Sequence, residues 1–248
     1  MKHNLNLFKV RKTCRIRILF RPLRPIFDEK FMDNNKTNTA VLFDFDGVVI
    51  DTETQYSVFW HRIGIDYLGM ADLETRIKGQ TLTYIYETFL PNMAERQKEI
   101  TAALDQFEQQ MTFDFIPGVL EFIDDLRRHN VPMAVVTSSN DKKMAAVRRV
   151  HPDLDCLFDR ILTAEMFTAS KPAPDCFLLG MQVLGSEPNT TWVFEDSFNG
   201  LRAGMASGAN VIGLATTNAR EAITPLCHAV IDDFRDFTYE KMLKVKKQ

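Results

Sequence analysis

Short apolar runs alternate with amphipathic segments along the second half of the chain. The runs predict strands at 132–137, 160–163, 191–195, 210–214 and 229–231. Between them, apolar residues recur every three or four positions and predict helices at 118–129, 140–150, 174–184 and 197–207. Residues 40–46 are almost continuously apolar, as expected of a strand buried on both faces. This alternation predicts an α/β fold, with a Rossmann-like parallel sheet sandwiched by helices.

Residues 53–115 have a different pattern of apolar positions. These positions follow a helical period, and the segment shows no convincing strand. We therefore predict a small all-helical domain at 53–115, inserted after the first strand. The core domain would then be formed by 38–52 together with 116–248.

The first 37 residues are basic, and two prolines, Pro22 and Pro25, prevent a long helix there. One interpretation is an Arg-rich arm for targeting or nucleic-acid binding. The other, which we favour, is a poorly ordered extension that precedes a working initiator at Met32.

Overall composition limits the classes of function. Of the 248 residues, 45% are hydrophobic, which is enough for one sizeable core and a smaller companion domain. A net charge of −3 indicates no general attraction to nucleic acid. The four cysteines are scattered, as in reduced proteins, and no apolar run approaches the roughly 18 residues of a membrane span. We expect a cytoplasmic protein without membrane or nucleic-acid partners, either a monomer or a weak dimer.

Candidate chemistry begins at the end of the first strand, where Asp44 and Asp46 stand two residues apart. Residues at i and i+2 of a strand point to the same side, so the two carboxylates would lie together. Two negative charges at a buried strand end need compensation, and Mg2+ is a hard ion that prefers carboxylate and carbonyl oxygens. The alternative is a strand that simply has a polar end.

Other predicted strand ends carry further polar residues: Thr137, Ser138, Ser139, Lys171, Glu195 and Asp196. Ligands of parallel α/β sheets bind beyond the carboxyl ends of the strands, so these side chains should gather at one edge. Together they could hold Mg2+ through carboxylates, and a phosphate through lysine, hydroxyls and backbone N–H groups.

Each of these residues also has an ordinary interpretation. Lys171 could be a surface lysine, and residues 137–139 could cap the following helix. Glu195 and Asp196 could likewise cap the helix at 197–207. Their coincidence at successive strand ends favours a site.

Four segments together resemble the motifs of the haloacid dehalogenase (HAD) superfamily, in the family's order. They are Asp44-Phe45-Asp46-Gly47-Val48, Thr137-Ser138-Ser139, Lys171-Pro172-Ala173-Pro174 and Glu195-Asp196-Ser197. The helical insert resembles that family's small cap domain. Asp51-Thr52 and Lys78-Gly79 resemble the branch of β-phosphoglucomutase-like proteins and sugar phosphatases.

The resemblance implies roles for individual residues. Asp44 would be the nucleophile that becomes an aspartyl phosphate, and Asp46 the general acid and base. Gly47 would permit the turn that aims Asp46. Mg2+ would be held by Asp44, the backbone carbonyl of Asp46, Asp196 and Glu195, the last directly or through water. Phosphoryl oxygens would contact Thr137 and Ser138, and Lys171 would offset the charge of Asp44.

Cap residues bear on the choice between two reactions. Trp60, Lys78 and Thr81 resemble the mutase cap and, with Ser139 and Asn140, are candidate substrate-binding residues. Tyr56, Leu82 and Asn140, however, stand where the mutases usually carry His, Arg and Lys. A mutase must bind a bisphosphate, so the loss of cations favours a phosphatase.

We therefore expect a Mg2+-dependent phosphatase acting on a small phosphate ester, such as a sugar phosphate, through an aspartyl phosphate. A β-phosphoglucomutase is the alternative, and a non-catalytic phosphate-binding protein is a third.

Overall fold

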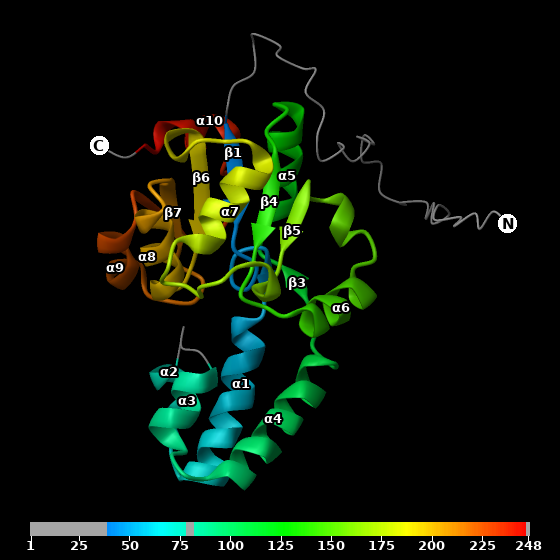
Figure 1. The fold of residues 1–248 in the computed structure, drawn as a ribbon, viewed down its shortest axis with the longest axis vertical. Helices are drawn as coiled ribbons and strands as arrows, with labels where there is room; N and C mark the ends of the chain where they lie inside the picture. Colours follow the sequence, from blue (N-terminus) through cyan, green and yellow to red (C-terminus); the bar gives the residue numbers. More distant parts are fainter. Residues whose placement is uncertain (1–38, 78–81, 247–248) are drawn as a thin grey trace, which may run out of the picture. The chain divides into compact units, whose positions relative to one another are not determined.

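The core of the chain is one parallel sheet. The structure is a computed structural model that describes residues 39–77 and 82–246. The six strands lie in the order β5-β4-β1-β6-β7-β8, and all neighbours are parallel (Figure 1). They are β1 (Ala40–Phe43), β4 (Met133–Val136), β5 (Arg160–Leu162), β6 (Thr191–Glu195), β7 (Asn210–Leu214) and β8 (Ala229–Ile231). The predicted α/β class is confirmed.

Helices follow these strands along the chain. They are α5 (Val119–Arg128), α6 (Asp141–Val150), α7 (Asp175–Leu184), α8 (Phe198–Ala206), α9 (Arg220–Ile223) and α10 (Tyr239–Lys244). Short 3-10 turns lie at Leu154–Cys156, Ala164–Met166, Pro188–Thr190 and Thr224–Leu226. None of the helices in the described part of the chain is long and apolar enough to cross a membrane.

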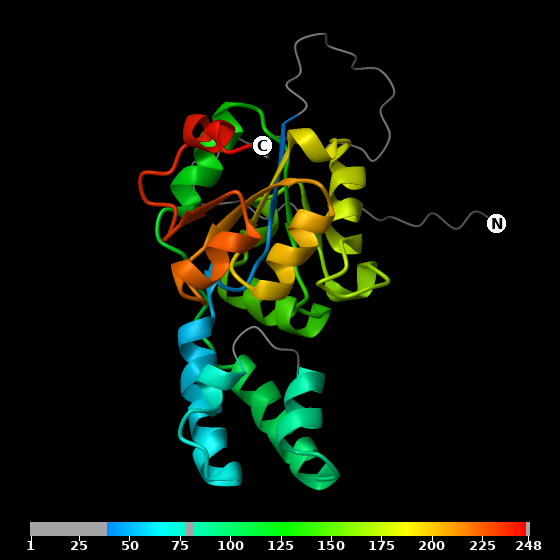
Figure 2. The ribbon, with the colours of Figure 1, turned by 90° about the vertical axis from the view of Figure 1, so that its left-hand side faces the viewer.

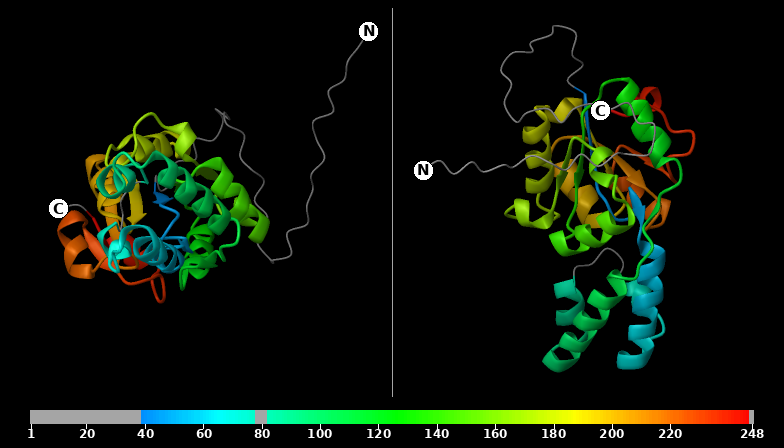
Figure 3. Two further views of the ribbon diagram at one scale, coloured as in Figure 1. Left: turned by 90° about the horizontal axis from the view of Figure 1, so that it is seen from below. Right: turned by 90° about the vertical axis from the view of Figure 1, so that its right-hand side faces the viewer.

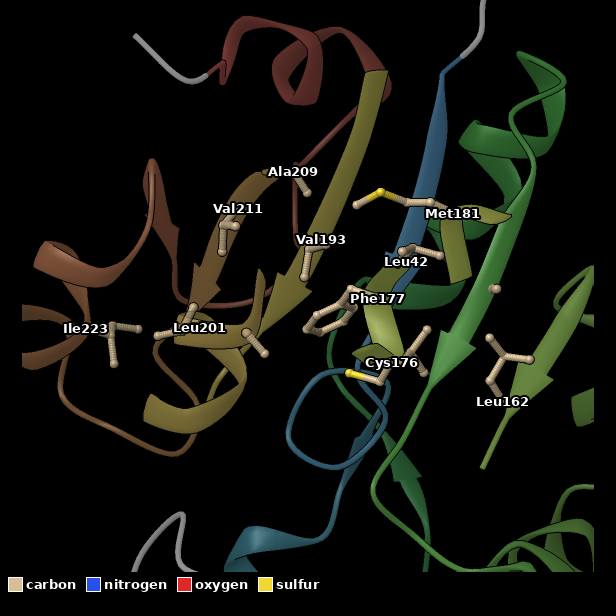
Figure 4. Packing of buried hydrophobic residues seen from close by; sticks show 13 residues of the cluster. Leu42, Leu162, Cys176, Phe177, Met181, Val193, Leu201, Ala209, Val211 and Ile223 are labelled. Atoms are coloured by element: carbon tan, nitrogen blue, oxygen red, sulfur yellow. The ribbon is translucent and has the colours of Figure 1, made fainter. Parts of the chain in front are cut away.

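Alternate side chains of each strand pack on opposite faces of the sheet, as strand geometry requires. Leu42 of β1 belongs to a buried cluster with Val193, and Phe177 and Leu201 bring α7 and α8 onto that face (Figure 4). The next residue, Phe43, stacks on Phe194 at 5.2 Å between ring centroids and contacts Phe122 of α5 at 6.2 Å. Both faces are therefore covered, with α5 and α7 on opposite sides (Figure 2).

Residues between β1 and α5 form the helical insert. Its helices are α1 (Glu53–Ile63), α2 (Leu73–Arg76), α3 (Leu82–Phe89) and α4 (Ala94–Glu108), with a π-helical turn at Gly64–Leu68. The insert has a hydrophobic core of its own: Trp60, Ile63, Leu73, Ile77, Ile85, Leu90 and Ile100. The all-helical cap predicted after the first strand is thus present.

One detail of the insert differs from the expectation. Its two connections to the core pair as a short antiparallel ribbon of β2 (Ile50–Asp51) and β3 (Asp114–Phe115), and they run side by side in Figure 3. Two-residue strands are too short to leave a periodic pattern, so the sequence did not predict them. The domain boundaries at 52/53 and 115/116 remain a prediction, and the basic extension 1–37 lies outside the described residues.

Candidate active site

Asp44 follows directly after β1 and lies at the carboxyl edge of the sheet. Its backbone N–H donates to the carbonyl oxygen of Phe194 at 2.9 Å, which continues the β1–β6 pairing by one residue. Nζ of Lys171, from the loop before α7, lies 2.5 Å from Oδ1 of Asp44 and 2.7 Å from Oε1 of Glu195. Lys171 is only 9% exposed, so the interpretation of it as a surface lysine is wrong.

Three buried carboxylates lie close together, and Lys171 contacts two of them. Asp44, Glu195 and Asp196 each offer an oxygen, and these oxygens all lie within 4.8 Å of one another. Burial and the charge of Glu195, opposed by Lys171, raise the pKa of Asp44 to about 7. Burial, Glu195 and Asp44 raise the pKa of Asp196 well above its usual value. Ionising all three carboxylates would leave more negative charge than one lysine can balance, so the cluster could hold a metal ion.

Glu195 is fixed by backbone groups as well as by Lys171. Its Oε2 accepts hydrogen bonds from the N–H groups of Asp196 and Ser197, both at 2.8 Å. Gly200 of α8 lies so close that a Cβ there would overlap the Glu195 carboxylate. The cap of α8 is the hydroxyl of Ser197, which accepts from the N–H of Gly200 at 3.1 Å. Glu195 therefore supports the loop before α8, while Ser197 caps the helix.

The loop after β7 supports the same cluster, and sequence reasoning missed it. The hydroxyl of Thr217 donates to Oδ2 of Asp196, and Nδ2 of Asn218 donates to the Asp196 carbonyl at 3.0 Å. The hydroxyl of Thr216 donates to the Gly47 carbonyl at 2.6 Å. These residues follow the carboxyl end of a predicted strand, so the rule that identified the other strand ends could have found them.

Asp46 occupies a separate environment from Asp44. Strand β1 ends at Phe43, and Gly47 has a φ of +76° in the turn that follows. The i, i+2 argument therefore does not describe this pair, because the pairing of β1 ends at Asp44 and the chain turns before a strand could reach Asp46. A Cβ on Gly47 would also overlap the Asp196 carboxylate, so the turn requires glycine.

Three donors surround the Asp46 carboxylate. Nζ of Lys143 lies 2.6 Å from Oδ1, and the Thr52 hydroxyl donates to the same oxygen at 2.8 Å. The Ser139 hydroxyl donates to Oδ2 at 2.7 Å. Burial alone would raise the pKa of Asp46, but the charge of Lys143 and these hydrogen bonds outweigh it, so the pKa is lowered. The surroundings of the two aspartates, which look similar in the sequence, therefore shift their pKa values in opposite directions.

Residues at the end of β4 contribute to the surroundings of Asp46, which Ser139 contacts. Thr137 is buried, and its hydroxyl accepts from the N–H of Ser139 at 2.9 Å, which leaves its own proton to donate. Ser138 is exposed. The cap of α6 is Asn140, whose side chain accepts from the N–H of Lys143 at 2.8 Å, rather than any of residues 137–139.

A cavity of about 460 Å³ lies between these residues and the helical insert. Core residues in its lining include Asp46, Ser138, Ser139, Asn140 and Lys143. The insert contributes aromatic, carboxylate and apolar side chains: Glu53, Tyr56, Ser57, Trp60, Glu74, Ile77, Leu82, Ile85, Thr101, Leu104, Asp105 and Glu108.

The candidate cap residues divide into two groups. Trp60 lines the cavity but is only 7% exposed, and it also belongs to the insert's own core. Tyr56 and Leu82 also line the cavity. Lys78 and Thr81 lie outside the described residues.

Lys143 is the main residue of the cavity that sequence reasoning overlooked. It lies in the first turn of α6, three residues after the cap Asn140. Lys143 lies in a segment rich in Lys and Arg, and its neighbour Lys142 is an exposed lysine. The composition of the segment therefore does not distinguish the buried lysine from the exposed one. The helical period was the available signal, because it turns position 143 toward the core.

Known proteins share both sequence and fold with the chain. Residues 41–214 match the family model "Haloacid dehalogenase-like hydrolase". Over 212 residues the chain is 30% identical to the "Probable pseudouridine-5'-phosphatase YKL033W-A" of Saccharomyces cerevisiae, which covers 78% of this chain and 86% of that protein. It is 30% identical over 182 residues to the "Phosphorylated carbohydrates phosphatase" of Thermotoga maritima, covering 68% and 81% of the two chains.

A solved structure supports the fold alone. The crystal structure of a HAD hydrolase of family IA, variant 3, from Entamoeba histolytica superposes with a TM-score of 0.71 at 23% identity. The match covers 84% of this chain and 98% of that one.

Proposed function

Because the chain belongs to the haloacid dehalogenase-like hydrolase family, we propose that it is a Mg2+-dependent phosphatase of small phosphorylated metabolites that works through an aspartyl phosphate. The proposal rests on the different surroundings of two neighbouring aspartates. Asp44 is held by Lys171 beside two further carboxylates, whereas Asp46 is held by Lys143 at the wall of the cavity.

The acidic cluster fits a divalent cation. Asp44 and Asp196 would hold Mg2+ through their carboxylates, together with the backbone carbonyl of Asp46. Both oxygens of Glu195 already contact Lys171 or backbone N–H groups, which favours a water-mediated role for that residue. When bound, Mg2+ supplies positive charge that offsets these carboxylates and the phosphoryl oxygens.

Asp44 is the nucleophile of the first step. Its carboxylate attacks phosphorus while the bond from phosphorus to the leaving oxygen breaks. Asp46 first takes up a proton, for example from the monoanion of the phosphate ester, and then gives it to that leaving oxygen. Lys171 stays beside the new phosphoryl group, and Thr137 and the N–H of Ser138 bind its oxygens. In the second step Asp46 takes a proton from water, whose oxygen attacks phosphorus and releases inorganic phosphate and the Asp44 carboxylate.

The cavity and the relatives both favour a polyhydroxylated leaving group. The lining carboxylates can accept hydrogen bonds from hydroxyls, and Tyr56 and Trp60 offer aromatic surface for a sugar or base. The names of the two relatives refer to a pseudouridine phosphate and to phosphorylated carbohydrates. We propose a sugar phosphate or nucleoside monophosphate as the substrate, bound by a monomer or a weak dimer.

A β-phosphoglucomutase remains the second candidate. Lys143 provides a buried cation at the cavity, and the comparison of cap residues with the mutases did not include it. Its Nζ is engaged by Asp46, however, so it is not available to a second phosphate. This engagement favours water over a sugar phosphate as the acceptor.

The test is a phosphate-release assay with Mg2+ on pseudouridine 5′-phosphate and a panel of sugar phosphates. We expect steady phosphate release from the wild type. Loss should exceed roughly 1,000-fold in Asp44→Asn, because the covalent route is lost. If the protein instead converts β-glucose 1-phosphate to glucose 6-phosphate in the presence of a catalytic amount of the bisphosphate, the phosphatase proposal is wrong and the protein is a mutase. Full activity in Asp44→Asn would remove Asp44 as the nucleophile, and phosphate binding without turnover would leave only a binding protein.

A further inference from the structure

Lys143 joins the core to the helical insert at the wall of the cavity. Its side chain is 8% exposed and extends from α6 to Oδ1 of Asp46 at 2.6 Å. The same Nζ lies 4.8 Å from the ring centroid of Tyr56 on α1. The Tyr56 hydroxyl in turn donates to Oε1 of Glu108 on α4 at 2.7 Å. The ammonium group is therefore held between a carboxylate of the core and an aromatic ring of the insert.

The contacts of the Asp46 carboxylate are unequal at its two oxygens. Oδ1 accepts from both Lys143 and Thr52, whereas Oδ2 accepts from Ser139. A carboxylate oxygen can accept about two hydrogen bonds, so these contacts fill Oδ1 and leave one position on Oδ2. Because Asp46 lines the cavity, that position is the one suited to a proton in transit.

We propose that Lys143 is a positioning residue for Asp46, holding Oδ1 so that Oδ2 delivers the proton to the leaving oxygen. This inference rests on the proposed phosphatase function and adds a residue to it. Lys143 acts through Asp46 and does not touch the transferred phosphoryl group. Tyr56 supports it, because the ring keeps the ammonium group in place from the side of the insert.

The inference separates two kinds of leaving group. Phenolate is a poor leaving group and gains from protonation, whereas p-nitrophenolate departs readily as an anion. A misplaced Asp46 should therefore slow cleavage of phenyl phosphate far more than cleavage of p-nitrophenyl phosphate. The two substrates have similar size and shape, so their ratio cancels general effects on binding.

The experiment compares kcat/KM for these two substrates with Mg2+ in wild type, Lys143→Met and Lys143→Arg. The constant kcat/KM reports the steps up to phosphorylation of Asp44, which is the step in which Asp46 acts as an acid. We expect Lys143→Met to lower kcat/KM roughly 10- to 100-fold for phenyl phosphate and less than about threefold for p-nitrophenyl phosphate. Lys143→Arg should recover part of the loss for phenyl phosphate, because it restores a cationic donor.

Lys142→Met is the matched control, since Lys142 is the neighbouring lysine on α6 and pairs with Asp105 of α4 at 2.5 Å without contacting Asp46. Its ratio of the two kcat/KM values should equal that of the wild type. If Lys143→Met does not fold, the same ratio is measured in Lys143→Gln, which keeps a shorter amide donor.

Equal losses on both substrates in the Lys143 variants would overturn the inference, because Lys143 would then act on folding or on binding. A selective loss for p-nitrophenyl phosphate would also overturn it. Failure of the proposed function looks different: the wild type itself would then release phosphate from neither substrate nor from any member of the sugar phosphate panel.

Discussion

Nζ of Lys171 lies 2.5 Å from Oδ1 of Asp44, and both side chains are almost fully buried. The same ammonium group contacts Glu195 at 2.7 Å, so one cation serves two carboxylates. This arrangement suits phosphoryl transfer, in which a negatively charged phosphoryl group approaches the same carboxylates. It also means that the stability of the protein depends on the number of charged groups in this cluster.

Lys171→Met should destabilise the protein strongly. The substitution leaves buried carboxylates without their cation, a change that typically costs about 3–5 kcal/mol of unfolding free energy. Urea denaturation at pH 8 in EDTA measures this loss. Lys142→Met breaks an exposed ion pair and should cost less than about 1 kcal/mol, which makes it the control. Equal stability of Lys171→Met and wild type would show that the buried pair is not formed in solution.

Asp196→Asn should have opposite effects with and without metal. In EDTA it relieves repulsion among Asp44, Glu195 and Asp196, so its melting temperature should exceed that of the wild type. Saturating Mg2+ should stabilise the wild type by roughly 1–3 kcal/mol and the variant much less, since a ligand is missing. Thermal unfolding with a Mg2+ titration provides both measurements. Equal stabilisation of both proteins would exclude Asp196 as a ligand.

The pKa of about 7 at Asp44 predicts a pH-dependent stability of the metal-free protein. A carboxyl group whose folded pKa lies above its unfolded value of 3.8 favours folding at low pH, and this contribution disappears as pH rises through about 7. Asp44→Asn lacks the titrating group. In EDTA, its stability relative to wild type should therefore grow between pH 5.5 and 8, by roughly 1–3 kcal/mol. A constant difference across this range in urea denaturation would contradict the raised pKa.

Two glycines of α8 provide a matched pair of substitutions. A Cβ at Gly200 would overlap the Glu195 carboxylate, whereas a Cβ at Gly204 would lie 3.1 Å from the nearest side-chain atom of Val211. Gly200→Ala should therefore displace Glu195 and lower turnover and Mg2+ affinity at least about tenfold, as loss of a supporting group at a metal site does. Gly204→Ala should affect stability more than Mg2+ affinity. Similar Mg2+ affinities in the two variants would show that the position of Glu195 does not matter.

The order of strands and helices and most of the acidic cluster can be predicted from the amino-acid sequence. Predicted strands at 191–195, 210–214 and 229–231 coincide with β6, β7 and β8, because buried parallel strands need apolar runs bounded by turns. Asp44, Lys171, Glu195 and Asp196 come together for a related reason: parallel strands place their carboxyl ends at one edge. Topology alone therefore predicted these neighbours.

The pairing of charges between elements that are distant in the chain depends on how the elements pack in three dimensions. Lys143 meets Asp46, and Thr217 meets Asp196, only because helix rotation and loop packing bring them together. In a basic helical segment, the local sequence does not show which lysine side chain is buried and which is exposed. The difference between Asp44 and Asp46 has the same origin, since a pKa depends on burial and neighbouring charges, which exist only in the folded chain.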